Sequence, residues 1–246
     1  MSLVAPERDI VLEAQRVLDA ATDVQLRLLG GLAIAVSTPG TPLLPRTYND
    51  IDFITGRGEG PKTVKLFESI GYEGDHRFNG INGHRRLLFY DAANERRVDV
   101  FVGRFEMCHT WPIEMRISAA ERTIPLGDLL LTKLQIFALN EKDQRDIFNL
   151  VHGHKLTEDD EGINVAYIAK LCAGDWGLWR TTTMNIERAR GAAQRFHLAP
   201  EDEAIVLSRL DDLRKRIDAE PKSTKWKLRA RVGERVQWYE DPEEIG

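Results

Sequence analysis

Cysteine is nearly absent from this chain of 246 residues, which contains only Cys108 and Cys172. Two cysteines that lie far apart provide neither a disulfide framework nor a cysteine-based zinc site, and they fit a reducing compartment, so we expect a cytoplasmic protein. Long apolar runs are also missing, since none approaches the roughly 20 residues that a membrane-spanning helix needs. Charged residues such as Glu7 and Glu13 interrupt the first 16 positions, so we expect no signal peptide.

Several catalytic motifs are absent as well. The chain has no Gly-x-Ser-x-Gly nucleophile elbow and no Gly-x4-Gly-Lys-Ser/Thr phosphate loop. His152 and His154 lie two residues apart at an expected helix end, but no further cysteine or aspartate follows in ligand spacing, so we interpret them as a loop rather than a metal site. Trp176 and Trp179 are expected in the core, with base stacking as the alternative.

The composition is that of a folded protein with a net negative charge. Hydrophobic residues make up 42% and charged residues 30% of the chain, which excludes a disordered protein, and the net charge of −5 excludes a general nucleic-acid coat. One segment has the opposite character. Residues 222–235, "KSTKWKLRARVGER", contain six basic residues and one acidic residue. This segment is either a solvated face or a local nucleic-acid contact.

Hydrophobic periodicity divides the chain into an α/β part and a helical part. We predict strands at 25–29, 50–55, 85–90 and 97–102, and helices at 7–20, 32–38, 61–70, 126–139, 142–152, 165–172, 176–196 and 201–219. Residues 113–124 are compatible with a further short strand. We therefore expect an α/β domain with a mixed sheet at 1–120 and a helical domain at 121–246, with the site in a cleft between them.

Two aspartates flank one isoleucine in the predicted strand at 50–55. Because side chains alternate along a strand, Asp50 and Asp52 point to the same face. Asp99 interrupts an apolar run in the strand at 97–102 in the same way. If the two strands are neighbours, three carboxylates converge on one side of the sheet, and their repulsion must be neutralised by basic residues or by one or two Mg²⁺ ions. The simpler alternative is that Asp50 caps its strand and Asp99 pairs with Arg96 or Arg97.

A glycine pair precedes these aspartates. Gly30 and Gly31 stand between a predicted strand and a predicted helix, where glycine lets a phosphate approach the backbone and the helix offers unpaired N–H groups. Any tight strand-to-helix turn uses glycine, so the order of the motifs is the informative feature: the glycine pair, a short helix, a loop with Arg46 and Thr47, and then Asp50 and Asp52.

These segments together resemble the DNA polymerase β-type nucleotidyltransferase superfamily. The resemblance covers "LLGGLAIAV", "RTYNDIDFI" and "RRVDVFV". It implies a nucleotidyltransferase fold and a Mg²⁺- or Mn²⁺-dependent transfer of a nucleoside monophosphate from a triphosphate such as ATP. In residue terms it implies that Asp50, Asp52 and Asp99 bind the metals, that Asp99 is a possible base, and that Gly30 and Gly31 hold the triphosphate. The family often has Gly-Ser where this chain has Gly-Gly, and Arg46 or Thr47 would replace the serine.

A second segment, "DLLLTKLQIFALNEKDQRDIFNLV", resembles the abortive-infection (toxin-like) nucleotidyltransferases. The resemblance implies nucleotide-binding roles for Lys133, Asp143 and Asp146, although this chain has Lys142-Asp143 where the family typically has Arg-Asp. The helical neighbours of Lys133 are apolar, so its amine either extends to solvent or reaches a phosphate. Asp143 and Asp146 share one helix face, where they orient Lys133 or a basic neighbour, or are solvated.

Three functions are compatible with these patterns. The first is nucleotidyl transfer to RNA, for example a tRNA 3′ end, in a toxin–antitoxin setting with a possible antitoxin partner. The second is transfer to a small molecule such as an aminoglycoside or lincosamide antibiotic. The third is a catalytically silent nucleotide-binding module on the same scaffold. The acidic composition favours the small molecule, and the basic segment at 222–235 favours RNA.

Overall fold

The structure is a computed structural model that describes residues 6–241. The chain separates into two compact units. The first contains the chain up to Ser37, Arg46–Phe105 and Trp111–Pro125, and the second contains Thr38–Pro45, Glu106–Thr110 and the chain from Leu126 onward. Two short segments of the first half of the chain therefore belong to the second unit. Each unit is described by itself below.

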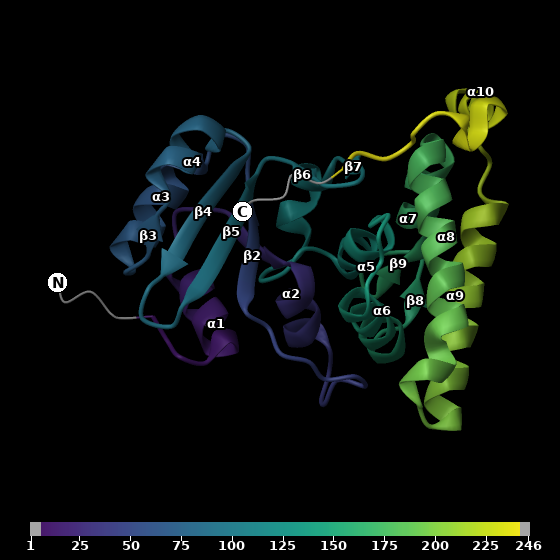
Figure 1. Ribbon diagram of the computed structural model, residues 1–246, viewed down its shortest axis with the longest axis horizontal. Coiled ribbons are helices and arrows are strands. Elements are labelled where there is room, and N and C mark those ends of the chain that lie inside the picture. The colour runs from purple at the N-terminus through teal and green to yellow at the C-terminus, as the bar shows by residue number, and fades with distance from the viewer. Residues whose placement is uncertain (1–5, 242–246) are drawn as a thin grey trace. The chain divides into compact units, whose positions relative to one another are not determined.

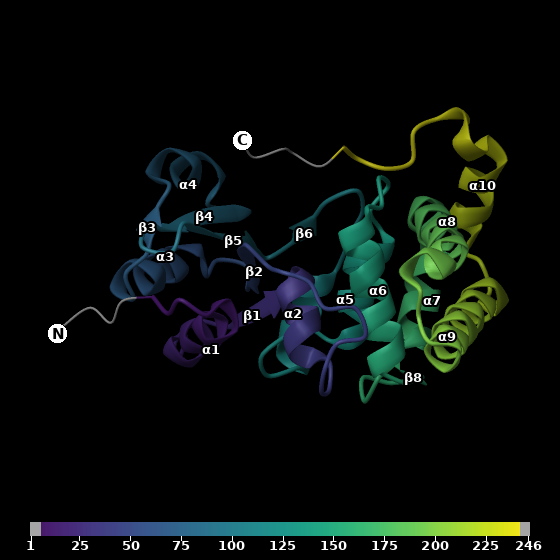
Figure 2. The same ribbon diagram turned by 60° about the horizontal axis from the view of Figure 1, so that its bottom comes forward.

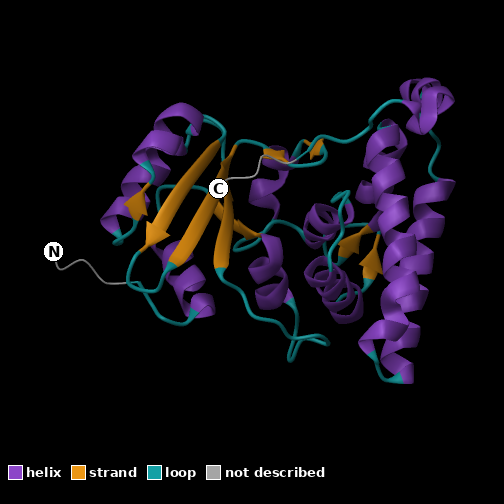
Figure 3. Ribbon diagram, viewed as in Figure 1, coloured by secondary structure: helices purple, strands orange, loops and turns teal. Residues whose placement is uncertain are grey.

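A mixed five-stranded sheet forms the centre of the first unit (Figure 3). Its strands follow the order β1 (Leu26–Leu29), β2 (Asp50–Thr55), β5 (Arg96–Val102), β4 (Arg86–Asp91) and β3 (Glu73–Gly74). The central pair β2 and β5 is parallel, and the other pairs are antiparallel. The prediction of a mixed sheet is therefore confirmed, and four of its five strands lie where the sequence pattern places them.

The two faces of this sheet differ in chemistry. Alternation places Phe53, Val98 and Val100 on one face, where all three are fully buried. Phe67 covers this face, and its ring centroid lies 6.0 Å from that of Phe53 and 4.3 Å from that of Phe89. The opposite face holds Asp50 and Asp52 of β2, Arg97 and Asp99 of β5, and Arg86 of β4. The apolar face thus anchors the strands, and the polar face is available for chemistry.

Four α-helices flank the sheet in Figure 1: α1 (Ile10–Ala20), α2 (Gly30–Ser37), α3 (Gly60–Ser69) and α4 (His76–Asn82). The first three were predicted. The side chain of Asp9 caps α1 by accepting hydrogen bonds from the amides of Val11 and Leu12. Helix α4 was not predicted. Where β3 ends, the side chain of Asn79 in α4 takes over the pairing with β4. The side-chain amide of Asn79 exchanges two hydrogen bonds of 2.7 and 2.9 Å with the backbone of Leu88.

Residues 113–124, which the sequence left compatible with a further short strand, do not form one. Ile113–Ala119 forms a 3₁₀ helix, and only Thr123 pairs with the sheet, through an isolated parallel bridge to Leu28. Ile113 and Ile117 are both fully buried, and this spacing of four residues suits one face of a helix and not of a strand.

The second unit is mainly helical, as predicted (Figure 2). Its α-helices are α5 (Leu126–Leu134), α6 (Glu141–Gly153), α7 (Val165–Gly174), α8 (Trp176–Ala192), α9 (Pro200–Ala219) and α10 (Thr224–Val232). Single turns of 3₁₀ helix follow at Ala193–Phe196 and Gly233–Arg235, and β8 (Leu156–Thr157) pairs with β9 (Ile163–Asn164). The predicted apolar stripe of α9, which includes Val206 and Leu210, is fully buried.

Strands β6 (Phe105–Glu106) and β7 (Thr110–Trp111) form a separate two-stranded sheet. Within the part of the chain that the structure describes, no helix combines the length and the apolar character that a membrane crossing requires.

Candidate functional site

The three predicted aspartates share one face of the central sheet. Strands β2 and β5 are parallel neighbours, which confirms the adjacency assumed from the sequence. Asp52 lies directly opposite Asp99, and Asp50 lies opposite Arg97. Neighbouring strands run about 4.8 Å apart, so the side chains of Asp52 and Asp99 leave the backbone at adjacent positions. Asp50 is exposed, Asp52 is half-buried and Asp99 is buried, so the acidic row runs from solvent into the protein.

Gly30 lies against the carboxylate of Asp52. Leu29 of β1 pairs with Asp52 of β2. Gly30, the next residue and the first of α2, therefore lies beside the Asp52 side chain. Gly30 has a φ of +73°, and a Cβ atom there would lie 2.2 Å from Oδ2 of Asp52. Any larger residue would collide with the carboxylate and strain the backbone. The glycine pair therefore has a structural role besides the predicted triphosphate contact, and Gly31 is buried behind it in α2.

Asp99 is held by Arg86, a residue that the sequence analysis did not single out. Nε of Arg86 donates to both carboxylate oxygens at 2.8 and 3.0 Å, and its Nη2 also donates to Oδ2. Leu88 lies opposite Asp99 in the β4–β5 register, so Arg86, two residues earlier, is its diagonal neighbour on the same face. This register was the signal that could have identified Arg86.

The interpretation that Asp99 pairs with Arg96 or Arg97 is therefore wrong. Arg96 points to the other face and lies 3.5 Å from the buried carboxylate of Asp91. Arg97 shares the face of Asp99 but lies opposite Asp50. The charged face therefore carries three carboxylates and two guanidinium groups.

Arg46 and Thr47 lie in the loop before β2. Nη1 of Arg46 donates to the carbonyl oxygen of Thr47 at 3.2 Å, and its guanidinium carbon lies 4.2 Å from the ring centroid of Tyr48. Thr47 is exposed. The predicted phosphate contact of either residue stays a prediction.

The second unit contains a compact charged cluster around Lys133. Its Nζ lies 3.1 Å from Oδ1 of Asp143 and 3.0 Å from Oδ2 of Asp146. The three side chains are only 12%, 8% and 0% exposed. The alternative in which the two aspartates orient Lys133 is thus confirmed, whereas Lys142 is exposed.

Two effects oppose each other at the amine of Lys133. Burial lowers its pKa, but the charges of Asp146 and Asp143 outweigh burial, and the pKa is raised above its ordinary value. Asp143 also forms a capping box with Asn140 at the start of α6. The cluster carries one net negative charge and fixes α5 to α6, and a nucleotide contact of its members stays a prediction.

His152 lies in the last turn of α6 and His154 is its C-cap residue, so the loop expected for both begins only at His154. Nε2 of His152 lies 2.8 Å from Oδ1 of Asp202. Within residues 6–241, no group of three or more histidine, cysteine, aspartate or glutamate side chains is arranged to hold a metal ion.

The acidic face has the oxygen donors that a hard divalent cation prefers, but its three carboxylates are not arranged as a metal-holding group among residues 6–241, and Arg86 is a local obstacle. Asp52 and Asp99 lie opposite each other, Asp50 lies on the same face, and carboxylate oxygens are the ligands that Mg²⁺ prefers. Arg86 occupies both oxygens of Asp99. Each carboxylate oxygen has two lone pairs, so a metal bound directly to Asp99 would share its oxygens with the guanidinium of Arg86.

Comparison of the chain with protein-family models, curated proteins and solved structures finds no significant match. The functional argument therefore depends on the residues and geometry described above.

Proposed function

We propose that this protein is a nucleotidyltransferase that moves a nucleoside monophosphate from a triphosphate such as ATP to an acceptor hydroxyl. The observation that carries the proposal is the pairing of Asp52 with Asp99 on the face where Gly30 opens α2. The order of elements also supports a nucleotidyltransferase fold. In the mixed sheet, a strand, the glycine pair and a helix precede the strand that carries Asp-x-Asp. The cytoplasmic location expected from the cysteine content fits a reaction that consumes nucleoside triphosphates.

The first unit supplies the groups that this reaction needs. The backbone of Gly30 and Gly31 at the start of α2 would bind triphosphate oxygens, because the first N–H groups of a helix lack intrahelical partners. Asp50, Asp52 and Asp99 would hold Mg²⁺ or Mn²⁺, which when bound would offset phosphate charge and polarise the α-phosphate. Asp99 is also the candidate base for the acceptor hydroxyl. Positioning and charge neutralisation would provide most of the rate enhancement.

The test is transfer of label from each α-labelled nucleoside triphosphate, with Mg²⁺ or Mn²⁺, to total RNA and separately to a panel of aminoglycosides and lincosamides. Asp52→Asn and Asp99→Asn should each reduce transfer roughly 100-fold or more, since each removes a charge that offsets the phosphates. Asp23→Asn is the matched control, because Asp23 is an exposed aspartate of the same unit. Full activity in either site variant would overturn the proposal, and the labelled product identifies the acceptor.

A catalytically silent nucleotide-binding module is the second candidate. The Arg86–Asp99 pair favours it, because Arg86 already neutralises one of the three carboxylates without a metal. In that case ATP should raise the melting temperature without Mg²⁺, and no triphosphate should transfer label. A melting temperature that responds to ATP only with Mg²⁺ favours the transferase.

A further inference from the structure

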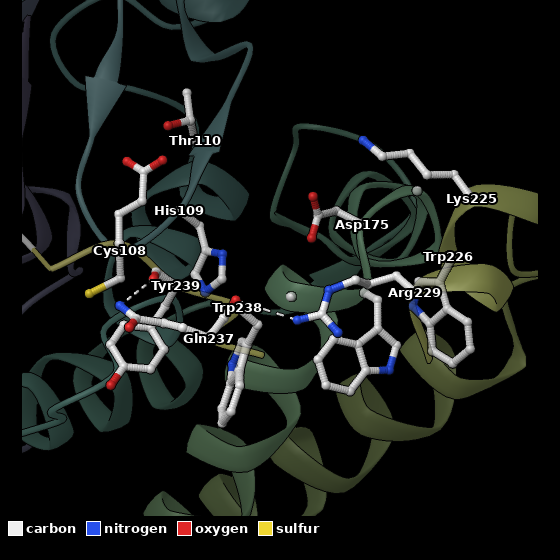
Figure 4. Close-up of a pocket in the computed structure, with 14 residues that line it drawn as sticks. Cys108, His109, Thr110, Asp175, Lys225, Trp226, Arg229, Gln237, Trp238 and Tyr239 are labelled. Atoms are coloured by element: carbon white, nitrogen blue, oxygen red, sulfur yellow. Dashed lines mark hydrogen bonds between the residues drawn. The ribbon is translucent and has the colours of Figure 1, made fainter. Parts of the chain in front are cut away.

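The inner side of helix α10 is built into the second unit. Ser223 caps the helix, and its hydroxyl accepts a hydrogen bond from the amide of Trp226 at 3.1 Å. The ring of Trp226 meets that of Trp179 edge to face, with the two centroids 5.1 Å apart. The guanidinium carbon of Arg229 lies 4.7 Å from the ring centroid of Trp176 (Figure 4). These contacts fix which side of α10 faces solvent.

The outer side of α10 carries an apolar stripe. Leu228 and Val232 lie one helical turn apart and are 55% and 40% exposed. Val236, shortly after the helix, is 58% exposed. Three of the nine large apolar side chains that are exposed within residues 6–241 therefore fall in nine consecutive positions. Single exposed apolar residues are ordinary on a protein surface, whereas a concentration on one short element is typical of an interaction surface.

Unpaired cations flank this stripe. Lys227 and Arg231 lie one turn apart along one edge of it, Lys225 lies at the other edge, and all three side chains are exposed. None of the three has a side-chain hydrogen bond or ion pair within the part of the chain that the structure describes. Glu234, the one acid among residues 222–235, is paired with Arg180 at 2.5 Å. The outer side of α10 is therefore positive on a chain whose net charge is −5.

We propose that the outer side of α10 docks an acidic amphipathic helix of another protein. The apolar stripe of that helix would cover Leu228 and Val232, and its flanking carboxylates would pair with Lys227 and Arg231. Helices recognise one another through apolar residues at this spacing, and the charges beside the apolar seam select the partner and its orientation. The inference goes beyond the proposed nucleotidyl transfer and does not depend on it, because α10 carries none of the residues proposed for that reaction.

Three other occupants fit this surface less well. A nucleic-acid strand would pair with the cations but would leave the apolar stripe uncovered, and Trp226, the aromatic residue of α10, packs inward and is not free to stack on a base. A helix that lies on a membrane usually carries Trp or Phe on its apolar face, and the outer side of α10 has neither. A second copy of α10 would place cations against cations. An acidic helix neutralises the cations and covers the stripe at the same time.

The first experiment measures the anisotropy of three labelled peptides bound to the full chain. Each has about 18 residues, long enough to cover α10. The first places a leucine stripe between rows of glutamates, the second has lysine in place of glutamate, and the third is a scrambled form of the first. The acidic peptide should bind with a Kd below about 1 mM, as suits a small interface, and the other two at least about 5-fold more weakly. No binding in that range, or equal affinity for the scrambled peptide, would overturn the proposal.

The second experiment changes the surface. Lys227→Glu combined with Arg231→Glu should weaken binding of the acidic peptide about 10-fold or more and remove its dependence on salt. Leu228→Ser combined with Val232→Ser should weaken it about 10-fold without changing the salt dependence. All four side chains are exposed, so the melting temperature should stay unchanged.

The matched control for the charge reversal is Lys155→Glu combined with Lys170→Glu, because both are exposed lysines of the same unit outside α10. The control should bind the acidic peptide like the wild type, and an equal loss in both double variants would refute the role of α10. Single-stranded RNA and vesicles that contain phosphatidylglycerol test the rival occupants. Tighter binding of either than of the acidic peptide, lost in the α10 charge reversal, would overturn a protein partner.

Discussion

Gly30 offers a sharp test of the geometry around Asp52. In Gly30→Ala the new Cβ would lie 2.2 Å from Oδ2 of Asp52, at a backbone φ of +73°. The left-handed conformation alone costs an alanine about 1–2 kcal/mol. Displacing the carboxylate adds about 1–3 kcal/mol, as in other overpacked sites. We therefore expect Gly30→Ala to lower the free energy of unfolding by about 2–5 kcal/mol, measured by urea denaturation.

A matched glycine separates the two contributions. Gly58 has a φ of +83°, and a Cβ there would meet nothing within 4 Å. Gly58→Ala should therefore lose only the conformational part, about 1–2 kcal/mol. The difference between the two variants measures the cost of moving the carboxylate.

A double variant isolates the contact with Asp52. In Gly30→Ala with Asp52→Ala the carboxylate is gone, so the double variant should be more stable than the sum of the two single changes predicts, by about 1–2 kcal/mol. Additive losses would show that the Asp52 side chain does not occupy the space next to Gly30.

Three further predictions concern Arg86, Lys133 and the titratable His109. Arg86→Gln should lower the free energy of unfolding, measured in urea, by about 2–3 kcal/mol. Mg²⁺ should recover part of this loss by binding the released Asp99, and no recovery would argue against a metal at Asp99. Lys133→Met should lower the free energy of unfolding by about 3–5 kcal/mol, because it removes the cation that the carboxylates of Asp143 and Asp146 share. Lys142→Met, at an exposed lysine, should lower it by less than about 0.5 kcal/mol. Similar losses in the two variants would contradict a structural role of Lys133. His109 has a folded pKa of about 4, below its ordinary 6.5, so its contribution is complete above pH 6.5 and is lost as the pH falls toward 4, by up to about 1.4 kcal/mol per pH unit. His109→Gln should flatten that slope in urea titrations between pH 7 and 4, and an unchanged slope would assign it to other groups.

The sequence predicted the elements with a clear apolar pattern and missed those without one. The strands of Asp50, Asp52 and Asp99 were predicted because buried apolar residues alternate around the acids, and this alternation also gave the shared face. Helices α4 and α10 were not predicted because neither contains a fully buried residue, so neither has a stripe that periodicity could reveal.

Contacts between distant segments explain the other differences. The helix predicted to extend to residue 139 ends at Leu134, where the side chain of Asn185 binds the carbonyl oxygens of Leu134 and Ile136. The Arg86–Asp99 pair depends on the register of the β4–β5 hairpin, and its turn contains Glu95 with a φ of +52°. A shift of one residue would place Arg86 on the opposite face. The first effect has no local signal in the sequence, and the second is indicated only by the pairing register of the predicted hairpin.

The most direct test of the central claim is a Mn²⁺-binding titration in the presence of ATP. Electron paramagnetic resonance measures the free Mn²⁺, and the bound Mn²⁺ follows by difference. We predict that the wild-type chain and Asp23→Asn bind Mn²⁺ equally, and that Asp52→Asn and Asp99→Asn each lose at least one bound ion. Unchanged Mn²⁺ binding in both site variants would contradict the assignment of these aspartates to a metal-dependent transfer site.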